Sequence, residues 1–207
     1  MLLLIEMIKI YSKHIVFKDI VNSLYHSIKN LGYKVCITDN INSNNEDIYI
    51  LVGAAEFIDI VPERYIVFQF EQTNISFNNN KDIWFTDKYI KLLKNADYVW
   101  DYSNDNINYL RNNFDVKTTF FYVPIRYSVI LDNFPKIKES NKDIDILFMG
   151  SINERRRNIL DKLEKKYKLH IASNNLWNEE REHLISRSKI VLNIQFYDNG
   201  ILELVRL

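Results

Sequence analysis

The chain of 207 residues carries 27 basic and 27 acidic side chains, so its formal net charge is zero, and 47% of its residues are apolar. That apolar content is enough for a substantial core, in one large domain or two small ones. The neutral charge balance argues against nucleic acid as the main partner. A single cysteine, Cys36, excludes an internal disulfide. We therefore expect a reducing compartment and a cytoplasmic protein.

The first ten residues, MLLLIEMIKI, are apolar, but Glu6 and Lys9 interrupt the run. A secretory signal would start with a basic segment, and a membrane-spanning helix needs about 20 apolar residues. The segment therefore predicts a buried first strand, with no signal peptide and no membrane span.

Strands and helices are predicted to alternate through the first part of the chain. Gly32 is expected at the C′ position of the first helix, and the Asn-rich stretch 73–80 is expected to be a loop. Apolar and periodic patterns predict strands over 1–10, 33–38, 47–52, 64–70, 96–100 and 118–123, and helices over 17–30, 82–95 and 105–113.

The same alternation resumes at Asp143, after a linker that Pro124 and Pro135 bracket. It predicts an α/β fold of parallel sheets with helices on both faces. We expect a Rossmann-like domain over residues 1–124, a linker over 125–142 and a second, short or incomplete Rossmann-like domain over 143–207. In that second domain the patterns predict strands over 144–149, 168–172 and 189–196, and helices over 154–166, over 178–186 and from 201 onward.

The stretch DIDILFMGSINERRR (143–157) runs from a strand through Gly150 into a basic helix. A helix N-terminus beside a strand end favours anions, because unpaired N–H groups and the helix dipole point there. Gly150 and Ser151 could offer N–H groups to a diphosphate, and Arg155 and Arg156 could neutralise it. Three consecutive arginines cannot all face one cleft, so a solvated basic turn is the alternative. Asp143 and Asp145 spell DxD, but they lead a buried strand and are interpreted as strand-edge charges.

Five stretches resemble glycosyltransferases of the GT-B fold (glycosyltransferase group 1-like). The resemblance implies two Rossmann-like domains, of which the N-terminal one binds the acceptor and the C-terminal one binds a nucleotide-diphosphate sugar. It implies transfer of the sugar to a sugar or other hydroxyl acceptor without a metal ion. GT-B enzymes continue past the point equivalent to residue 207, so a C-terminally truncated relative is expected. The stretches are YIVFQFEQ (65–72), NADYVWDYSNDNINYL (95–110), FFYVPIRYS (120–128), DIDILFMGSINERRRNIL (143–160) and SKIVLNIQFYDNGILELVRL (188–207).

The resemblance also assigns donor-binding residues near the end of the chain. It implies that Gly200 and Ile201 offer N–H groups to phosphate and that Glu203 accepts hydrogen bonds from the ribose hydroxyls. The alternative for Glu203 is a carboxylate that merely suits a helix N-terminus. Asn174 follows a strand and could reach a base or sugar edge, or simply form the turn.

Two residues of the first domain are candidate catalytic groups. His14 follows the first strand, where the resemblance implies a base that takes the acceptor proton, and imidazole titrates near neutrality. Glu71 follows the strand of FQFEQ and could bind acceptor hydroxyls or act as the base. A loop histidine and a turn carboxylate without a role are the alternatives. The four histidines of the chain are scattered without metal-ligand spacing, so neither a metal nor a further cofactor is expected.

Two other functions compete with sugar transfer. One is a catalytically degenerate GT-B-like protein that binds ligands or serves a structural role. The other is a nucleotide-binding enzyme such as a dehydrogenase, which the lack of a GxGxxG or Walker pattern disfavours. An open sheet edge in a short second domain would favour a homodimer.

Overall fold

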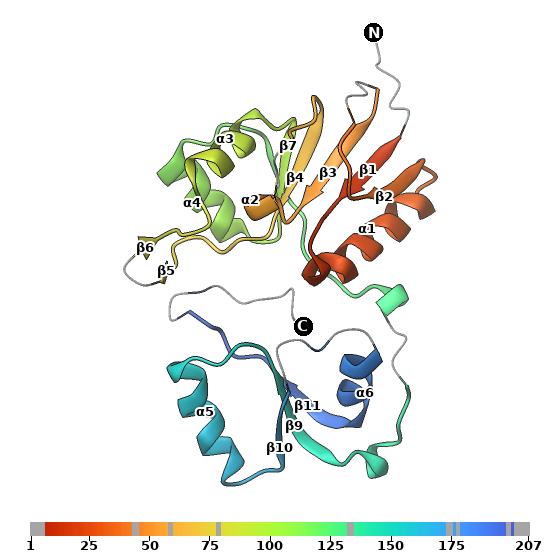
Figure 1. Cartoon of the computed structure of the whole chain (residues 1–207), viewed down its shortest axis with the longest axis vertical. Coiled ribbons are helices and arrows are strands. Elements are labelled where there is room, and N and C mark those ends of the chain that lie inside the picture. The colour runs from red at the N-terminus through yellow and green to blue at the C-terminus, as the bar shows by residue number, and fades with distance from the viewer. Residues whose placement is uncertain are drawn as a thin grey trace. The chain divides into compact units, whose positions relative to one another are not determined.

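The computed structural model describes residues 7–42, 46–57, 60–77, 80–131, 135–172, 176, 179–197 and 200. The chain divides into two compact units, Met1–Ile130 and Leu131–Leu207 (Figure 1). Among the described helices, none combines the length and the apolar character that crossing a membrane requires.

The first unit is built on a six-stranded sheet in the order β2-β1-β3-β4-β7-β8, and each neighbouring pair of strands is parallel. The order reverses between β1 and β3, which is the topological switch point of a doubly wound, Rossmann-like sheet. The strands are β1 (Ile8–Tyr11), β2 (Val35–Thr38), β3 (Ile48–Val52), β4 (Tyr65–Gln69), β7 (Tyr98–Asp101) and β8 (Phe120–Tyr122).

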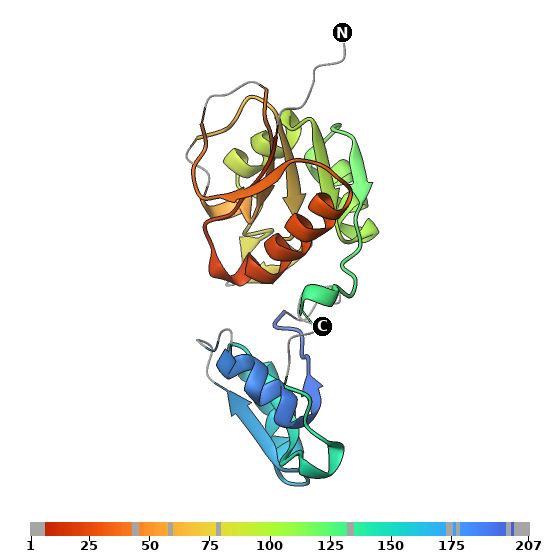
Figure 2. The ribbon, with the colours of Figure 1, turned by 90° about the vertical axis from the view of Figure 1, so that its right-hand side faces the viewer.

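Helices cover both faces of this sheet, as the alternation predicts. Helix α1 (Lys18–Asn30), preceded by the 3₁₀ turn Ile15–Phe17, lies on one face, and α3 (Asp87–Asn95) and α4 (Asn104–Phe114) lie on the other (Figures 1 and 2). The short α2 (Ala54–Phe57) connects β3 to β4. Every residue of β3 and β4 is buried, as continuous apolar runs in a parallel sheet require.

The short helix α2 was not predicted from the sequence, and the structure differs from the prediction at three further places in this unit. The first strand extends to Tyr11, and residues 1–6 of the predicted strand lie outside the described residues. Helix α3 begins at Asp87 rather than at residue 82, because the Thr86 hydroxyl caps it by accepting from the Tyr89 N–H at 3.3 Å. The Asn-rich stretch contains a short antiparallel pair, β5 (Ser76–Phe77) and β6 (Asn80–Lys81).

Gly32 confirms the predicted end of α1. Its φ is +87°, and its N–H donates to the Lys29 carbonyl at 3.0 Å. A positive φ at C′ is the conformation that glycine adopts at least cost.

The second unit is a three-stranded parallel sheet in the order β10-β9-β11, made of β9 (Ile144–Met149), β10 (Leu169–Ala172) and β11 (Ser188–Leu192). Its helices α5 (Glu154–Glu164) and α6 (Glu179–Arg187) pack on opposite faces (Figure 1). The side chain of Leu160 joins the apolar cluster around Phe148, whereas α6 packs into the cluster around Leu147. The 3₁₀ turns Val129–Leu131 and Glu139–Asn141 lie in the stretch predicted as a linker.

The second sheet has its own switch point. Strand β9 lies between β10 and β11, so the connection reverses direction beside β9. The crevice of such a sheet lies outside the carboxyl ends of the two strands that flank the reversal, here Met149 of β9 and Leu192 of β11.

Candidate functional site

The first turn of α5 is tied by side chains to the segment that follows β11. Asn153 caps the helix, because its Oδ1 accepts from the Arg156 N–H at 2.9 Å, and its Nδ2 donates to the Phe196 carbonyl at 2.7 Å. Arg155 donates through Nη1 to the Gln195 carbonyl at 2.8 Å. The carboxyl edges of β9 and β11 therefore form one connected site.

Gly150 and Ser151 lie at the start of this site, directly after β9. Gly150 has a φ of +139°, a conformation that L side chains rarely adopt. Ser151 is exposed, and its carbonyl accepts from Nη1 of Arg156 at 2.7 Å. The positive φ of Gly150 thus lets the backbone turn from β9 toward α5, as a strand–glycine–helix connection requires.

The three consecutive arginines occupy three different environments. Arg155 is half-buried, Arg156 is 1% exposed, and Arg157 is exposed beside Asp161, with 3.7 Å between Nη1 and Oδ1. Each residue of a helix is rotated about 100° from the one before, so only one of the three can point into the core. The structure places the Arg156 guanidinium against backbone carbonyls.

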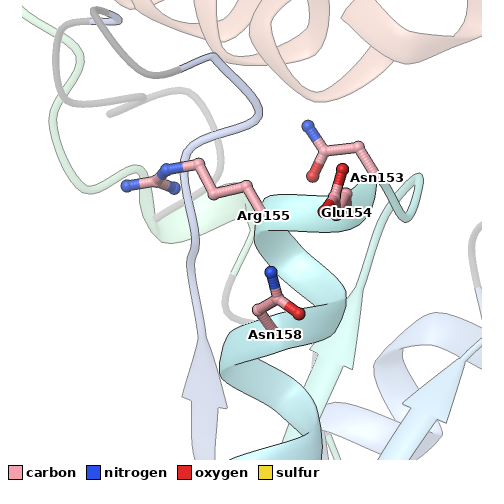
Figure 3. A pocket seen from close by; sticks show the side chains of 4 residues that line it. All are labelled: Asn153, Glu154, Arg155 and Asn158. Carbon is pink, nitrogen blue, oxygen red and sulfur yellow. The ribbon is translucent and has the colours of Figure 1, made fainter.

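An open pocket of about 480 Å³ lies on the outer surface of this turn, lined by Asn153, Glu154, Arg155 and Asn158 (Figure 3). The side chain of Arg155 extends from the helix toward the segment after β11, and Asn158 lies below it on the same helix. A guanidinium, a carboxylate and two amides make this pocket polar, with donors and acceptors for a polar ligand.

Of the remaining residues predicted for donor binding, the structure describes Gly200 alone. Gly200 is half-buried and belongs to no helix or strand. Asn174, Ile201 and Glu203 lie outside the described residues, so their assignments stay predictions.

His14 directly precedes the 3₁₀ turn that leads into α1, and it is exposed. Its Nδ1 accepts from the Val16 N–H at 3.2 Å. A neutral imidazole that accepts at Nδ1 carries its proton on Nε2. In this arrangement His14 serves as a cap, and it would have to release Val16 before Nδ1 could take a proton.

Glu71 lies two residues after β4 and is half-buried. Its backbone is held at both ends. The Glu71 N–H donates to Gln69 Oε1, and its carbonyl accepts from Gln69 Nε2 at 2.8 Å and from Asn106 Nδ2 at 3.2 Å. Strand β3 lies between β1, which precedes His14, and β4, which precedes Glu71.

A fully buried polar network fixes this part of the first unit. Gln69, Asp101 and Asn106 are each 0% exposed. Gln69 Nε2 donates to Asp101 Oδ2 at 2.8 Å, Asn106 Nδ2 donates to Asp101 Oδ1 at 3.2 Å, and the Thr73 hydroxyl donates to Asn106 Oδ1 at 2.9 Å. This network was not predicted from the sequence. A glutamine between two phenylalanines in a buried strand was the signal that could have revealed the network.

Burial raises the pKa of Asp101 to about 7, while hydrogen bonds from the Ser103 N–H, Gln69 and Asn106 act in the opposite direction. Burial also raises the pKa of Tyr89, whose hydroxyl donates to Gln69 Oε1 at 3.4 Å, and the charges of Glu71 and Asp101 add to that rise. A carboxyl that titrates near neutrality can change its hydrogen-bonding role within the physiological range.

The switch point of the first sheet is closed by an aromatic ring. Gly53, directly after β3, has a φ of +71°, and a Cβ on it would lie 2.3 Å from Cε2 of Phe17. The Phe17 ring also packs against Phe70, with 5.7 Å between ring centroids. Here the glycine makes room for a side chain of the protein itself.

Asp143 and Asp145 lie at the opposite, amino end of β9 and form ion pairs within the chain. Asp143 pairs with Arg187 at 2.5 Å and Asp145 with Lys189 at 2.6 Å. The hydrogen bond from Arg187 lowers the pKa of Asp143 to about 2. Across the described ranges, no group of three or more His, Cys, Asp or Glu residues is arranged to hold a metal ion.

Comparison with known proteins finds two viral relatives. The chain is 26% identical over 192 residues, 88% of its length, to the uncharacterized protein L137 of Acanthamoeba polyphaga mimivirus. It is 28% identical over 117 residues, 54% of its length, to the uncharacterized protein L140 of the same virus. The matched stretches cover 24% of L137 and 37% of L140, so the chain spans well under half the length of the curated relatives it matches. No family model and no solved structure matches the chain.

Proposed function

We propose that the chain is a GT-B-like glycosyltransferase module that binds a nucleotide-diphosphate sugar at the β9/β11 switch point of the second unit. The observation that carries the proposal is the meeting of Gly150, Ser151 and the basic first turn of α5 at that one sheet edge. Ligands of open α/β sheets bind at such edges, and a helix N-terminus favours phosphate. The resemblance of five sequence stretches to GT-B enzymes supplies the reaction class.

In this proposal Arg155 is the protein group nearest to the diphosphate. Sugar transfer forms a bond from the acceptor oxygen to the anomeric carbon and breaks the bond from that carbon to the diphosphate oxygen. The nucleoside diphosphate leaves with the electron pair, so a positive group beside it stabilises the developing charge. Glu203 would hold the ribose, as the resemblance implies, with Gly200 and Ile201 beside the phosphates.

The acceptor loses its hydroxyl proton in this reaction, and the proposed bases are His14 and Glu71 of the first unit. His14 must first give up the Val16 N–H that its Nδ1 accepts. Glu71 has its backbone held by Gln69 and Asn106, which fixes the point from which its side chain extends. Donor hydrolysis measured with His14→Ala and Glu71→Gln separates the two candidates, and the true base is the one whose loss lowers the rate at least about 100-fold.

Calorimetric titration with UDP, GDP and their sugar conjugates tests the binding step. Arg155→Gln should weaken the nucleoside diphosphate about tenfold, since a hydrogen bond to a charged group contributes about 1.5 kcal/mol or more. Arg157→Gln is the matched control, because it removes the same charge from an exposed ion pair two positions later on the same helix. Absence of heat at millimolar nucleotide would contradict the proposal.

The second candidate is a protein that binds the nucleotide without transferring the sugar. The engagement of His14 Nδ1 by the Val16 N–H favours it, since a base in this state is not ready to accept a proton. Nucleotide binding by calorimetry together with no hydrolysis or transfer of any sugar donor would establish this alternative.

A further inference from the structure

We propose that Arg156 is a positioning residue, which fixes the segment 194–196 against the turn after β9 and so shapes the proposed nucleotide site without touching the ligand. The inference rests on the proposed function for its ligand. It departs from the sequence-based expectation that the Arg156 guanidinium neutralises the diphosphate.

All three kinds of guanidinium nitrogen of Arg156 donate to backbone carbonyls. Nε and Nη2 donate to the Ile194 carbonyl at 2.9 and 2.5 Å, and Nη1 donates to the Ser151 carbonyl at 2.7 Å. Ile194 follows β11 and Ser151 follows β9, so one side chain bridges the two strand ends of the switch point. With 1% of its surface exposed, Arg156 is poorly placed to meet a ligand that arrives from solvent.

Two aromatic rings hold the guanidinium in place. Its central carbon lies 5.5 Å from the ring centroid of Phe148 on β9 and 5.1 Å from that of Phe196 after β11. A planar guanidinium stacks on aromatic faces and donates in fixed directions within its plane, whereas a lysine ammonium is a compact point charge. The site therefore requires the shape of arginine as well as its charge.

Neighbouring side chains of α5 extend the same pattern along the segment. Arg155 donates to the Gln195 carbonyl and Asn153 to the Phe196 carbonyl, so three successive carbonyls accept from one helical turn. The described peptide bonds are trans, and in a trans peptide the N–H points opposite to the C=O. The amide N–H groups of residues 195–197 are therefore directed away from α5, in an orientation that Arg156 anchors.

The experiment compares Arg156→Lys with Arg157→Lys in the full chain. Both substitutions keep the positive charge. Hydrogen exchange of the amides in 151–153 and 193–197 reports the local opening of the segment without ligand, and calorimetry with UDP and GDP reports binding. We expect Arg156→Lys to speed exchange in both segments at least tenfold and to weaken the nucleotide about tenfold, and Arg157→Lys to change neither.

Salt dependence distinguishes positioning from direct contact, since removing a phosphate-contacting charge lowers the sensitivity of affinity to ionic strength. Arg155→Gln should reduce that sensitivity, whereas Arg156→Gln, which also removes a charge, should weaken binding and leave the sensitivity unchanged. The positioning role would be overturned if Arg156→Lys kept the full nucleotide affinity, or if it weakened the affinity without changing hydrogen exchange. If wild-type protein binds no nucleotide, the proposed function fails, and the exchange comparison still decides whether Arg156 fixes the segment.

Should Arg156→Lys not fold, Phe196→Leu offers a milder test. It removes one aromatic wall and leaves the guanidinium and its carbonyl partners in place. Exchange in 193–197 should accelerate about threefold, and unchanged exchange would count against the positioning role of Arg156.

Discussion

The two parallel sheets close their switch points by different means. In the first unit the ring of Phe17 fills the space beside Gly53, and the polar groups are gathered at the ends of β4 and β7 instead. In the second unit Asn153, Arg155 and Arg156 close the corresponding position with hydrogen bonds to carbonyls. The apolar Phe17 ring fills the crevice of the first sheet. The polar side chains of the second unit line the crevice of its sheet. The comparison favours the second unit for an anionic ligand.

The largest expected effect, and so the strongest test of this comparison, is in the pH dependence of stability. The folded-state pKa of Asp101 is raised from 3.8 to about 7, so between these values the folded protein binds more protons than the unfolded chain. Stability from this group is fully present below about pH 4 and is lost as pH rises through about 7, by up to roughly 4 kcal/mol. Urea unfolding monitored by circular dichroism from pH 4 to 8 should show this fall.

Asp101→Asn should flatten the same profile, because the titrating carboxyl is gone. Tyr89 is the phenol facing the network, and it titrates far above this window, so it does not contribute to the decline. A decline of unchanged size in the variant would assign the effect to another group.

The buried network itself is the next test. Asn106→Ala should destabilise the protein by roughly 3 kcal/mol, because Asp101, the Glu71 carbonyl and the Thr73 hydroxyl each lose a buried partner. Asn113→Ala on the same helix is the control, since the exposed Asn113 donates to the Tyr109 carbonyl in its own helix. Equal losses of unfolding free energy for the two variants would mean that the network contributes little.

Gly53→Ala probes the apolar closure and should cost about 2 kcal/mol, from its positive φ and from the clash with Phe17. Gly32→Ala supplies the comparison, because its φ is also positive but nothing lies within 4 Å of the added Cβ, and about 1 kcal/mol is expected. The difference between the two unfolding free energies measures the Phe17 contact. If Gly53→Ala lowers the unfolding free energy no more than Gly32→Ala does, the Phe17 ring moves away without cost and does not close the crevice.

Much of the fold follows from local pattern. The strand at Ile144–Met149 and the helix start at Glu154 agree with prediction, because an apolar run, a glycine and an asparagine cap all act locally. The β5–β6 pair was missed because each strand has only two residues, too few to show an alternating pattern. The late start of α3 depends on which of several polar residues caps the helix.

The candidate sites were less predictable because burial depends on distant partners. Arg155, Arg156 and Arg157 are identical in sequence terms, and only the position of β11 decides which of them enters the core. Likewise, Gln69 and Asn106 are 37 positions apart in the chain and become neighbours through the pairing of β4 with β7.

Strand β11 carries one further consequence, for how the protein behaves at high concentration. It lies at the edge of its sheet among the described strands, and its Ile190 and Val191 side chains are 56% and 42% exposed. Lys189, the charge on this strand, is already neutralised by Asp145. An apolar edge strand with little net charge is a template for pairing with another chain. Self-association that grows with protein concentration is the expected behaviour, and a charge introduced at Ile190 is the substitution that would suppress it.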